Sequence, residues 1–179
     1  MKLLVKILGK LGIVKTATKK NENYLDELNI PFRNHNSQID ALTPSLITIG
    51  ENFVSAPGSR IISHDSSLVL SRGILRYGKV IIGNNVFLGA NSVILAGSKI
   101  GDNCIIGAGA VVKGEFESNS VIVGNPAKKI MTIDELFIKT KKTNDYIEIP
   151  IEFLKKMKKS KLSFEDRKNI EKIVNEKLL

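Results

Sequence analysis

The sequence is poor in cysteine, proline and tryptophan. Its 179 residues include one Cys, five Pro and no Trp. The single cysteine, Cys104, cannot form an intramolecular disulfide, so nothing indicates an oxidising compartment. No apolar run reaches the roughly 18 to 20 residues of a membrane-spanning helix. Lys2, Lys6 and Lys10 interrupt the apolar N-terminus, which is not typical of a signal peptide. These absences exclude disulfide-stapled and membrane-spanning classes and predict a cytoplasmic protein.

The net charge of +9 is concentrated at the two ends of the chain. Residues 1–20 hold six lysines and no acidic residue, and residues 128–179 hold fourteen basic and nine acidic residues. Residues 21–127 hold seven basic and nine acidic residues. A nucleic-acid-binding fold usually carries a basic stripe of its own, so we expect no nucleic-acid partner. With 42% apolar and 25% charged residues, the composition indicates one ordinary globular domain.

A period of six runs through the middle of the chain. The hexads from residue 82 to residue 117 all begin with a branched aliphatic residue, and Gly takes the second position in four of the six: Ile82, Leu88, Ile94, Ile100, Ile106 and Val112, with Gly83, Gly89, Gly101 and Gly107. The fifth positions are mostly small, from Val86 to Phe116. A period of six fits neither a helix nor an alternating strand. It predicts an all-β solenoid, in which each hexad supplies one short strand and one turn.

The same phase occurs earlier, at Ile49 and Ile61, and breaks before residue 82. The break predicts a loop that leaves the coil at about residues 66–80, and loops on rigid scaffolds often carry function. We therefore expect three regions. Residues 1–46 form a basic lead-in, residues 47–130 form the solenoid, and residues 131–179 form a Lys-rich helical extension.

Three features together resemble the hexapeptide-repeat acyltransferases: the hexads, the segment SHDSS before the loop, and the closing segment VIVGNPAKKI. The sequence is most similar to the sugar O-acetyltransferase branch, which includes galactoside acetyltransferase and enzymes that decorate surface polysaccharides. The resemblance covers roughly residues 47–130. It implies a left-handed parallel β-helix, a homotrimer with active sites between subunits, and acetyl-CoA as the acetyl donor.

The reaction that the resemblance implies needs a base for the acceptor hydroxyl, and imidazole is well suited to this near neutral pH. The chain has two histidines. His64 lies where the family places its catalytic histidine, before the extruded loop. His35 precedes the repeats with no motif around it. Asp65 is a second candidate, although neighbouring residues of an extended chain point to opposite sides, which argues against contact with the His64 ring.

The resemblance also implies positions for the oxyanion and the coenzyme. The backbone amide of Ala90, after Gly89, maps to the family's oxyanion donor. Gly107, Ala108 and Gly109 lie where the pantetheine arm passes, although they also suit ordinary turns. Lys128 follows GNPA, where the family places a cation near the 3′-phosphate.

Two features depart from the family pattern. Phe87 stands where many relatives have Trp. Lys113 stands one position earlier than the family's Thr-Lys pair, which puts its coenzyme contact in question.

Both ends of the chain show helical patterns. Residues 2–14 place apolar and lysine side chains on opposite faces, as in an interfacial membrane helix or a helix that packs on the coil. We favour packing over membrane contact. Ser163 and Asp166 form a predicted capping box before an amphipathic C-terminal helix.

Alternatives to a saccharide O-acetyltransferase are an N-acetyltransferase of a nucleotide-linked amino sugar, a serine O-acetyltransferase and a non-catalytic solenoid scaffold. The zinc-dependent solenoid hydratases need three histidine ligands, so two histidines predict no metal site.

Overall fold

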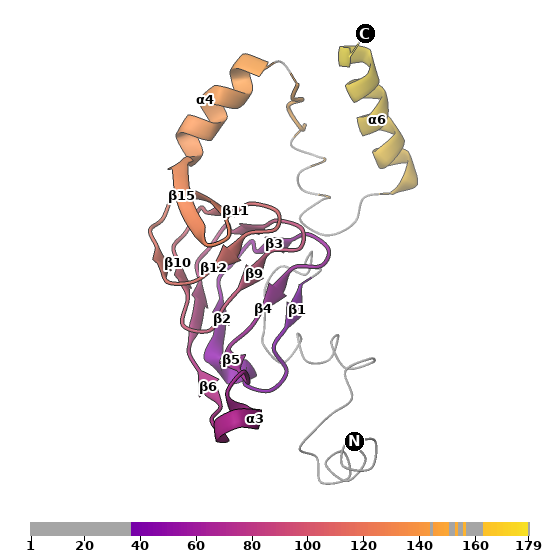
Figure 1. Ribbon diagram of the computed structural model, residues 1–179. Helices are drawn as coiled ribbons and strands as arrows, with labels where there is room; N and C mark the ends of the chain where they lie inside the picture. Colours follow the sequence, from indigo (N-terminus) through magenta and orange to yellow (C-terminus); the bar gives the residue numbers. More distant parts are fainter. Residues whose placement is uncertain (1–36, 144, 151–152, 154–155, 157–162, 179) are drawn as a thin grey trace.

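The computed structural model describes residues 37–143, 145–150, 153, 156 and 163–178. Three sheets wind around a common interior and form a coil (Figure 1). All strands within the coil pair in parallel. The first sheet contains β1 (Gln38–Ile39), β4 (Arg60–Ile61), β9 (Val93–Ile94) and β12 (Val111–Val112). The second contains β2 (Ile47–Ile49), β7 (Val80–Ile82), β10 (Lys99–Ile100) and β13 (Glu115–Phe116). The third contains β3 (Val54–Ser55), β8 (Phe87–Leu88), β11 (Ile105–Ile106) and β14 (Ser120–Gly124).

Each regular turn of the coil consists of three hexads. Val93 pairs with Val111, and Phe87 pairs with Ile105, so each residue lies beside the residue three hexads further along. The chain passes from the first to the second to the third sheet and back, so the coil has three edges. We name them edge 1–2, edge 2–3 and edge 3–1, after the sheets that each one joins. The predicted solenoid period is thus confirmed.

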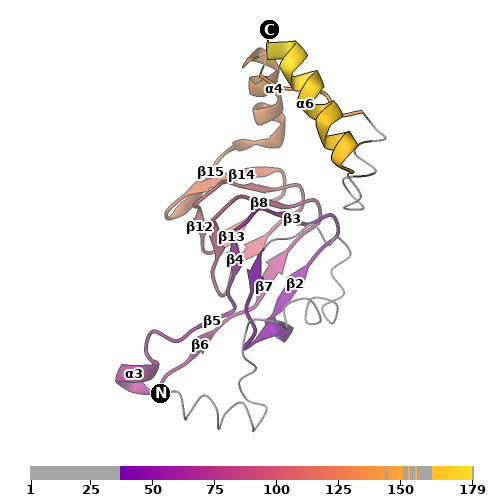
Figure 2. The ribbon, with the colours of Figure 1, turned by 90° about the vertical axis from the view of Figure 1, so that its right-hand side faces the viewer.

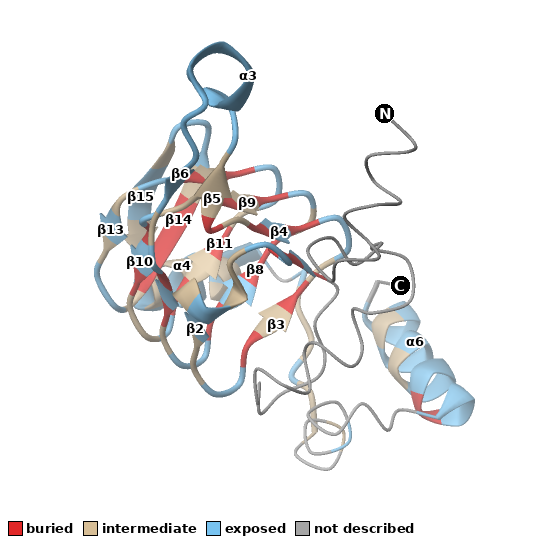
Figure 3. Ribbon diagram, turned by 90° about the horizontal axis from the view of Figure 1, so that it is seen from below, coloured by how far each residue is buried: buried red, intermediate tan, exposed pale blue. Residues whose placement is uncertain are grey.

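The first positions of the predicted hexads form the interior. They are at most 1% exposed: Ile82, Leu88, Ile94, Ile100, Ile106 and Val112. Small fifth-position residues, including Ser92, Ser98, Cys104 and Ala110, are buried with them. Figure 3 shows buried residues within the coil and exposed residues over α3. Burial of branched aliphatic side chains from every strand is the main stabilising contribution to such a coil.

Asparagines make the corners of edge 2–3. Asn52, Asn85 and Asn103 adopt left-handed conformations, with φ between 53° and 56°. Their amides stack, since Asn52 Nδ2 donates to Asn85 Oδ1 and Asn85 Nδ2 donates to Asn103 Oδ1, both at 2.9 Å. Asn tolerates this backbone region better than most side chains, which explains its recurrence at the turns.

The coil departs from the spacing of three hexads in three places. That spacing would pair Gln38 with residue 56, Arg60 with residue 78 and Lys99 with residue 117. Gln38 instead pairs with Arg60, Arg60 pairs with Val93, and Lys99 pairs with Glu115. All three irregular stretches lie on edge 1–2. The first includes Asp40 and a 3₁₀ helix, η1 (Pro44–Leu46). Because β1 pairs with β4, the coil begins at β1, before the expected boundary at residue 47.

The longest irregular stretch is the extruded loop. It begins with β5 (His64–Asp65), continues through α3 (Val69–Arg72) and returns through β6 (Arg76–Tyr77), which pairs antiparallel with β5. The loop projects from one end of the coil (Figure 1). In the structure, the segment expected to leave the coil at about residues 66–80 has a two-stranded ribbon, β5 with β6, at its base.

The last hexad differs from the prediction. Because the final coil is shorter than three hexads, β13 begins at an earlier residue than the repeat predicts, and Phe116 pairs with Ile100. Phe116 therefore takes a first-position place and packs on the core, in contrast to the predicted fifth position.

The C-terminal part leaves the coil at the end opposite the extruded loop (Figure 2). β15 (Ala127–Thr132) pairs antiparallel with β14 and leads into α4 (Ile133–Thr143), and α6 (Phe164–Leu178) follows. The Ser163–Asp166 capping box is confirmed: Asp166 N donates to Ser163 Oγ, and Ser163 N donates to Asp166 Oδ2. Lys156 also contacts Asp166, and its hydrogen bond, ahead of those from Ser163, lowers the pKa of Asp166 to about 2.

The helix predicted over residues 2–14 lies outside the described residues, as does His35. In the described part of the chain, no helix combines the length and the apolar character needed to span a bilayer.

Candidate active site

His64 lies at the base of the extruded loop, on edge 1–2. Its Nδ1 contacts Asp40 Oδ2, which comes from the irregular stretch one coil earlier. The His64 side chain is 25% exposed and the Asp40 side chain is 3% exposed. The imidazole therefore has one nitrogen held by a buried carboxylate, while part of the ring is open to solvent. This arrangement suits a base that takes a proton from a bound molecule.

Among the described residues, five donors on three residues give hydrogen bonds to Asp40. Its Oδ1 accepts from the backbone N–H of Leu42 at 2.9 Å. Its Oδ2 accepts from the backbone and hydroxyl of Ser63, at 2.9 and 3.0 Å, and from the backbone and ring of His64. Burial raises the pKa of Asp40, but the hydrogen bonds from Leu42, Ser63 and His64 outweigh it and hold the pKa below its ordinary value. Asp40 therefore stays ionised and is fixed in position.

Thr43 extends this network behind the carboxylate. Its Oγ1 lies 2.7 Å from Ser63 Oγ, and Ser63 Oγ also contacts the Thr43 carbonyl at 2.9 Å. The network fixes the carboxylate, and the carboxylate fixes the ring. Such outer contacts determine how well a catalytic side chain is oriented.

Asp65 does not contact the His64 ring in the structure. Its carboxylate accepts from the Ser67 backbone N–H at 2.9 Å and lies 3.4 Å from Arg76. These two contacts, with Ser67 the larger, lower the pKa of Asp65. The carboxylate that does contact the ring, Asp40, was not identified from the sequence. Its only signal is a polar residue directly after the inward-facing Ile39.

The predicted coenzyme residues lie on two different edges. Ala90 and the Gly107–Gly109 turn are on edge 3–1, one coil apart, and Gly109 N donates to Ala90 O at 2.8 Å. Lys113 is on edge 1–2, where its Nζ contacts the Ala96 carbonyl. Lys128 is exposed on β15.

The glycines of edge 3–1 differ in their surroundings. A Cβ on Gly89 would lie 2.5 Å from Ala108 N, and one on Gly107 would lie 2.7 Å from Val123 Cγ1. Both glycines are therefore needed for close stacking of the coils. Gly109 differs, because a Cβ there would meet nothing within 4 Å. Among the described residues, no backbone acceptor takes the Ala90 N–H. Edge 3–1 thus offers open space beside Gly109 and an amide that is available to a ligand.

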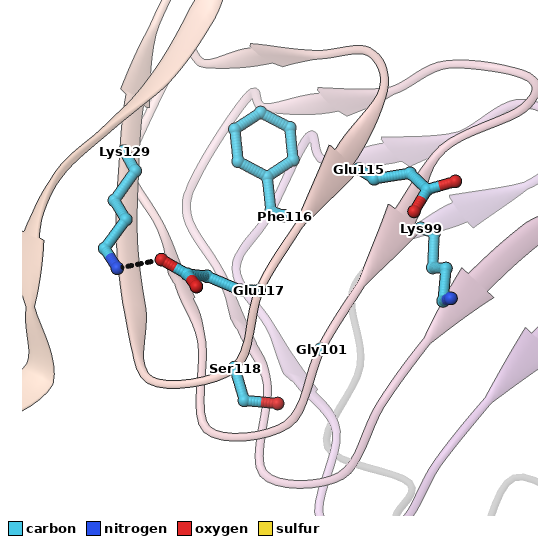
Figure 4. Close-up of a pocket in the computed structure, with 7 residues that line it drawn as sticks. All are labelled: Lys99, Gly101, Glu115, Phe116, Glu117, Ser118 and Lys129. Carbon is cyan, nitrogen blue, oxygen red and sulfur yellow. Dashed lines mark hydrogen bonds and ion pairs between the residues drawn. The ribbon is translucent and has the colours of Figure 1, made fainter.

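A hollow of about 390 Å³ adjoins His64 and is lined by Gln38, Ile39, Asp40, Ala41, Leu42, Arg60, Ile61 and Ile62. This size is within the range of small-molecule sites. A larger hollow of about 650 Å³ lies on the second sheet near the other end of the coil (Figure 4). There, Lys129 pairs with Glu117, and Lys99 is the strand partner of Glu115. The larger hollow includes neither His64 nor Asp40, so we assign the chemistry to the smaller one.

No group of three or more His, Cys, Asp or Glu side chains in the described part of the chain is arranged to hold a metal ion.

Comparison with known proteins identifies the repeat. Residues 79–114 match the family model of the bacterial transferase hexapeptide (six repeats). The chain is 34% identical over 104 residues to the putative acetyltransferase YvoF of Bacillus subtilis (strain 168), covering 58% of each protein. It is 36% identical over 92 residues to the galactoside O-acetyltransferase of Escherichia coli (strain K12), covering 50% of this chain and 45% of that protein.

Among solved structures, a maltose O-acetyltransferase from Clostridium difficile 630 is 28% identical, with a TM-score of 0.49. The match covers 73% of this chain and 85% of that one. The chain spans less than two thirds of the length of the two curated relatives named above. The repeat and the similarity to a galactoside O-acetyltransferase confirm the resemblance to hexapeptide-repeat acyltransferases and to their sugar O-acetyltransferase branch.

Proposed function

Because the coil carries the hexapeptide repeat of the bacterial transferases, we propose that the protein is an acetyl-CoA-dependent O-acetyltransferase. It transfers the acetyl group to a saccharide hydroxyl, in the synthesis of a surface polysaccharide. The observation that carries this proposal is the pair of His64 and buried Asp40 beside a hollow of suitable size. Similarity to a galactoside O-acetyltransferase supports a sugar acceptor.

His64 is the general base. With Nδ1–H donating to Asp40, the neutral ring carries its lone pair on Nε2, which accepts the proton of the acceptor hydroxyl. The hydroxyl oxygen then attacks the thioester carbon, and the C–S bond breaks. The protonated ring returns its proton to the departing sulfur. Between these two proton transfers Asp40 stabilises the imidazolium, as a carboxylate does for a catalytic histidine in other acyl transfers.

The charge that develops on the thioester oxygen needs a fixed donor, and the N–H of Ala90 fits this role. The open space beside Gly109 suits the pantetheine arm, and exposed Lys128 suits the 3′-phosphate. Gly89, Gly107 and Ala108 shape the turns around this path.

The placement of these residues supports a site between subunits. His64 follows a strand of the first sheet and Ala90 precedes one, so the two lie on opposite edges of that sheet. A second copy that places its edge 3–1 beside edge 1–2 would complete the site. We therefore propose a homotrimer of left-handed coils, as the family resemblance implies.

Replacing His64 with alanine tests the proposal. We expect kcat to fall by about 10²- to 10⁴-fold, the usual contribution of a positioned general base. The KM for acetyl-CoA should change little, because the base contacts the acceptor. His35→Ala, which removes the other histidine of the chain, is the matched control and should retain wild-type rates.

The assay measures free thiol released from acetyl-CoA with sugars, nucleotide-linked amino sugars and serine as acceptors. Preference for an amine or for serine would contradict the proposed acceptor. Absence of transfer to all three classes would favour a non-catalytic scaffold. Light scattering gives the oligomeric state, and full activity as a dilute monomer would contradict sites between subunits.

A further inference from the structure

The hollow beside His64 contains a cation whose role in the fold is not evident. Arg60 lies on β4 with its side chain exposed, next to Gln38 on β1 in the parallel register. Within the part of the chain that the structure describes, the Arg60 guanidinium makes no hydrogen bond or ion pair. An arginine that stabilises the fold normally donates to a carboxylate or to backbone carbonyls. Arg60 is instead exposed and lines the hollow beside His64.

The two acidic residues of the site, Asp40 and Asp65, already have partners. Asp40 is 3% exposed and accepts the hydrogen bonds described above, so its charge faces the His64 ring and the backbone of the loop base. Asp65 is bound by Ser67 N and Arg76. No other acidic residue occurs between Asp65 and Asp102, although that stretch holds four basic residues. Arg60 therefore gives the hollow a positive charge that no ion pair within the described residues neutralises, which favours an anionic ligand.

The rest of the hollow suits a sugar ring. Ile39 and Ile61 are buried beneath it, and Leu42 is 53% exposed at its wall, which provides an apolar surface for the C–H face of a pyranose. Gln38 offers both an amide donor and an acceptor for hydroxyl groups. Apolar walls with a few fixed polar groups are typical of small-molecule sites.

We propose that Arg60 binds an anionic group on the acceptor, so that the enzyme acts on acidic saccharides in preference to neutral ones. The anionic group is a carboxylate or a phosphate, and both match the two parallel N–H donors of a guanidinium. The inference rests on the proposed function, because it names the acceptor of the same site. Arg60 and His64 line one hollow, so the charged group and the reacting hydroxyl belong to the same or to adjacent sugar residues.

The test compares matched neutral and acidic sugars with the full-length wild-type protein. The pairs are glucose with glucuronate, galactose with galacturonate, and glucose with glucose 6-phosphate. We expect kcat/KM to be at least about 10-fold higher for an acidic member, and added salt to reduce that preference. The first two pairs test a carboxylate and the third tests a phosphate, so the preferred pair identifies the group.

Arg60→Gln should lower kcat/KM for the acidic sugar by about 10- to 100-fold, the usual range for a charge-assisted hydrogen-bonded pair, and should lower kcat/KM for the neutral partner far less. Arg72→Gln removes the same charge from the exposed helix α3 and is the matched control. It should change neither rate by more than about twofold. A melting curve of each variant checks the fold, which exposed substitutions should preserve.

Calorimetric binding of the same sugars, without acetyl-CoA, separates this inference from the proposed function. Tighter binding of an acidic sugar that is lost in Arg60→Gln supports the inference even if no acetyl transfer occurs. The inference is overturned if the two members of every pair bind and react alike. It is equally overturned if no sugar binds. It is also overturned if Arg60→Gln and Arg72→Gln have equal effects, since the preference would then depend on the overall positive charge of the protein and not on contact with Arg60.

Discussion

Replacing Asp40 with asparagine keeps the size of the side chain and removes the charge that holds the His64 ring. In the wild-type protein both carboxylate oxygens accept, one from Leu42 N and the other from Ser63 and His64. An amide has one acceptor oxygen and one NH₂ group. If the oxygen faces Ser63 and His64, the NH₂ group faces the Leu42 N–H. The opposite orientation sets the NH₂ group against several donors.

The size of the effect follows from this count. The partly buried Leu42 N–H, left without an acceptor, costs about 1–3 kcal/mol, and the remaining hydrogen bonds lose their charge assistance, which is about half of their strength. We therefore expect Asp40→Asn to lower the free energy of unfolding by about 2–4 kcal/mol at pH 7. Because the ring loses its orientation and its stabilising carboxylate, kcat should fall by about 10²- to 10⁴-fold, with little change in the KM for acetyl-CoA.

The stability difference should depend on pH. Burial raises the pKa of Asp40, but its hydrogen bonds outweigh this effect, so the pKa in the folded protein lies below the ordinary value of 3.8. A carboxylate of this kind contributes stability that is fully present above the unfolded-state pKa and is lost as the pH falls through the folded-state pKa. The gap between the wild-type protein and Asp40→Asn should therefore be constant above about pH 5 and narrow below about pH 4.

Urea denaturation from pH 7 to pH 3 measures the gap, and thiol release from acetyl-CoA measures kcat. Asp65→Asn is the matched comparison, since Asp65 directly follows His64 in the sequence but binds Ser67 and Arg76 in place of the ring. It should have the smaller effect on both quantities. A larger loss of activity in Asp65→Asn than in Asp40→Asn would refute the assignment of Asp40 as the residue that positions His64.

The remaining predictions concern the coenzyme path and the C-terminal helix. Gly89→Ala should destabilise the coil by about 1–3 kcal/mol in urea denaturation, because the new Cβ would lie 2.5 Å from Ala108 N. Gly109→Asn should leave the melting temperature unchanged, since Asn91 adopts the same left-handed backbone one coil earlier. It should raise the KM for acetyl-CoA about 10-fold, and an unchanged KM would exclude pantetheine from this space. Ser163→Ala should reduce the far-ultraviolet circular dichroism signal of helix, because removing an N-cap costs α6 about 1 kcal/mol.

The interior of the coil could be predicted from the sequence because one physical requirement repeats at every hexad. Each short strand turns one side chain inward, and only a branched aliphatic or a small residue fits the narrow interior. Ile94 and Ile100 show this, since both are at most 1% exposed at the predicted positions. His64 is predicted as the base because the family resemblance places its catalytic histidine there, directly before the loop at which the period stops.

Asp40 could not be identified from the sequence, because its position depends on pairing between distant segments. The repeat predicts a partner for Gln38 at residue 56, three hexads on, whereas the structure pairs Gln38 with Arg60. Only the parallel register of β1 with β4 brings Asp40 to the backbone of Ser63 and His64. The predicted position of Phe116 in the shortened last coil was wrong for a similar reason, because no residue type marks a deletion within an otherwise regular pattern.

The irregular stretches of three coils all lie on edge 1–2, and this relates the fold to the proposed chemistry. Edges 2–3 and 3–1 keep their spacing throughout, which gives the stacked turns a rigid and repeated geometry. Edge 1–2 is lengthened in the first coil, where Gln38 pairs with Arg60, and again in the second, where Arg60 pairs with Val93. The first addition begins close to Asp40 and the second begins close to His64. Two insertions on successive coils of one edge are adjacent in space, so a carboxylate from one and an imidazole from the other can meet without disturbing the buried core. In a solenoid, the places where the chain departs from its period on the same edge are therefore the first places to search for catalytic residues.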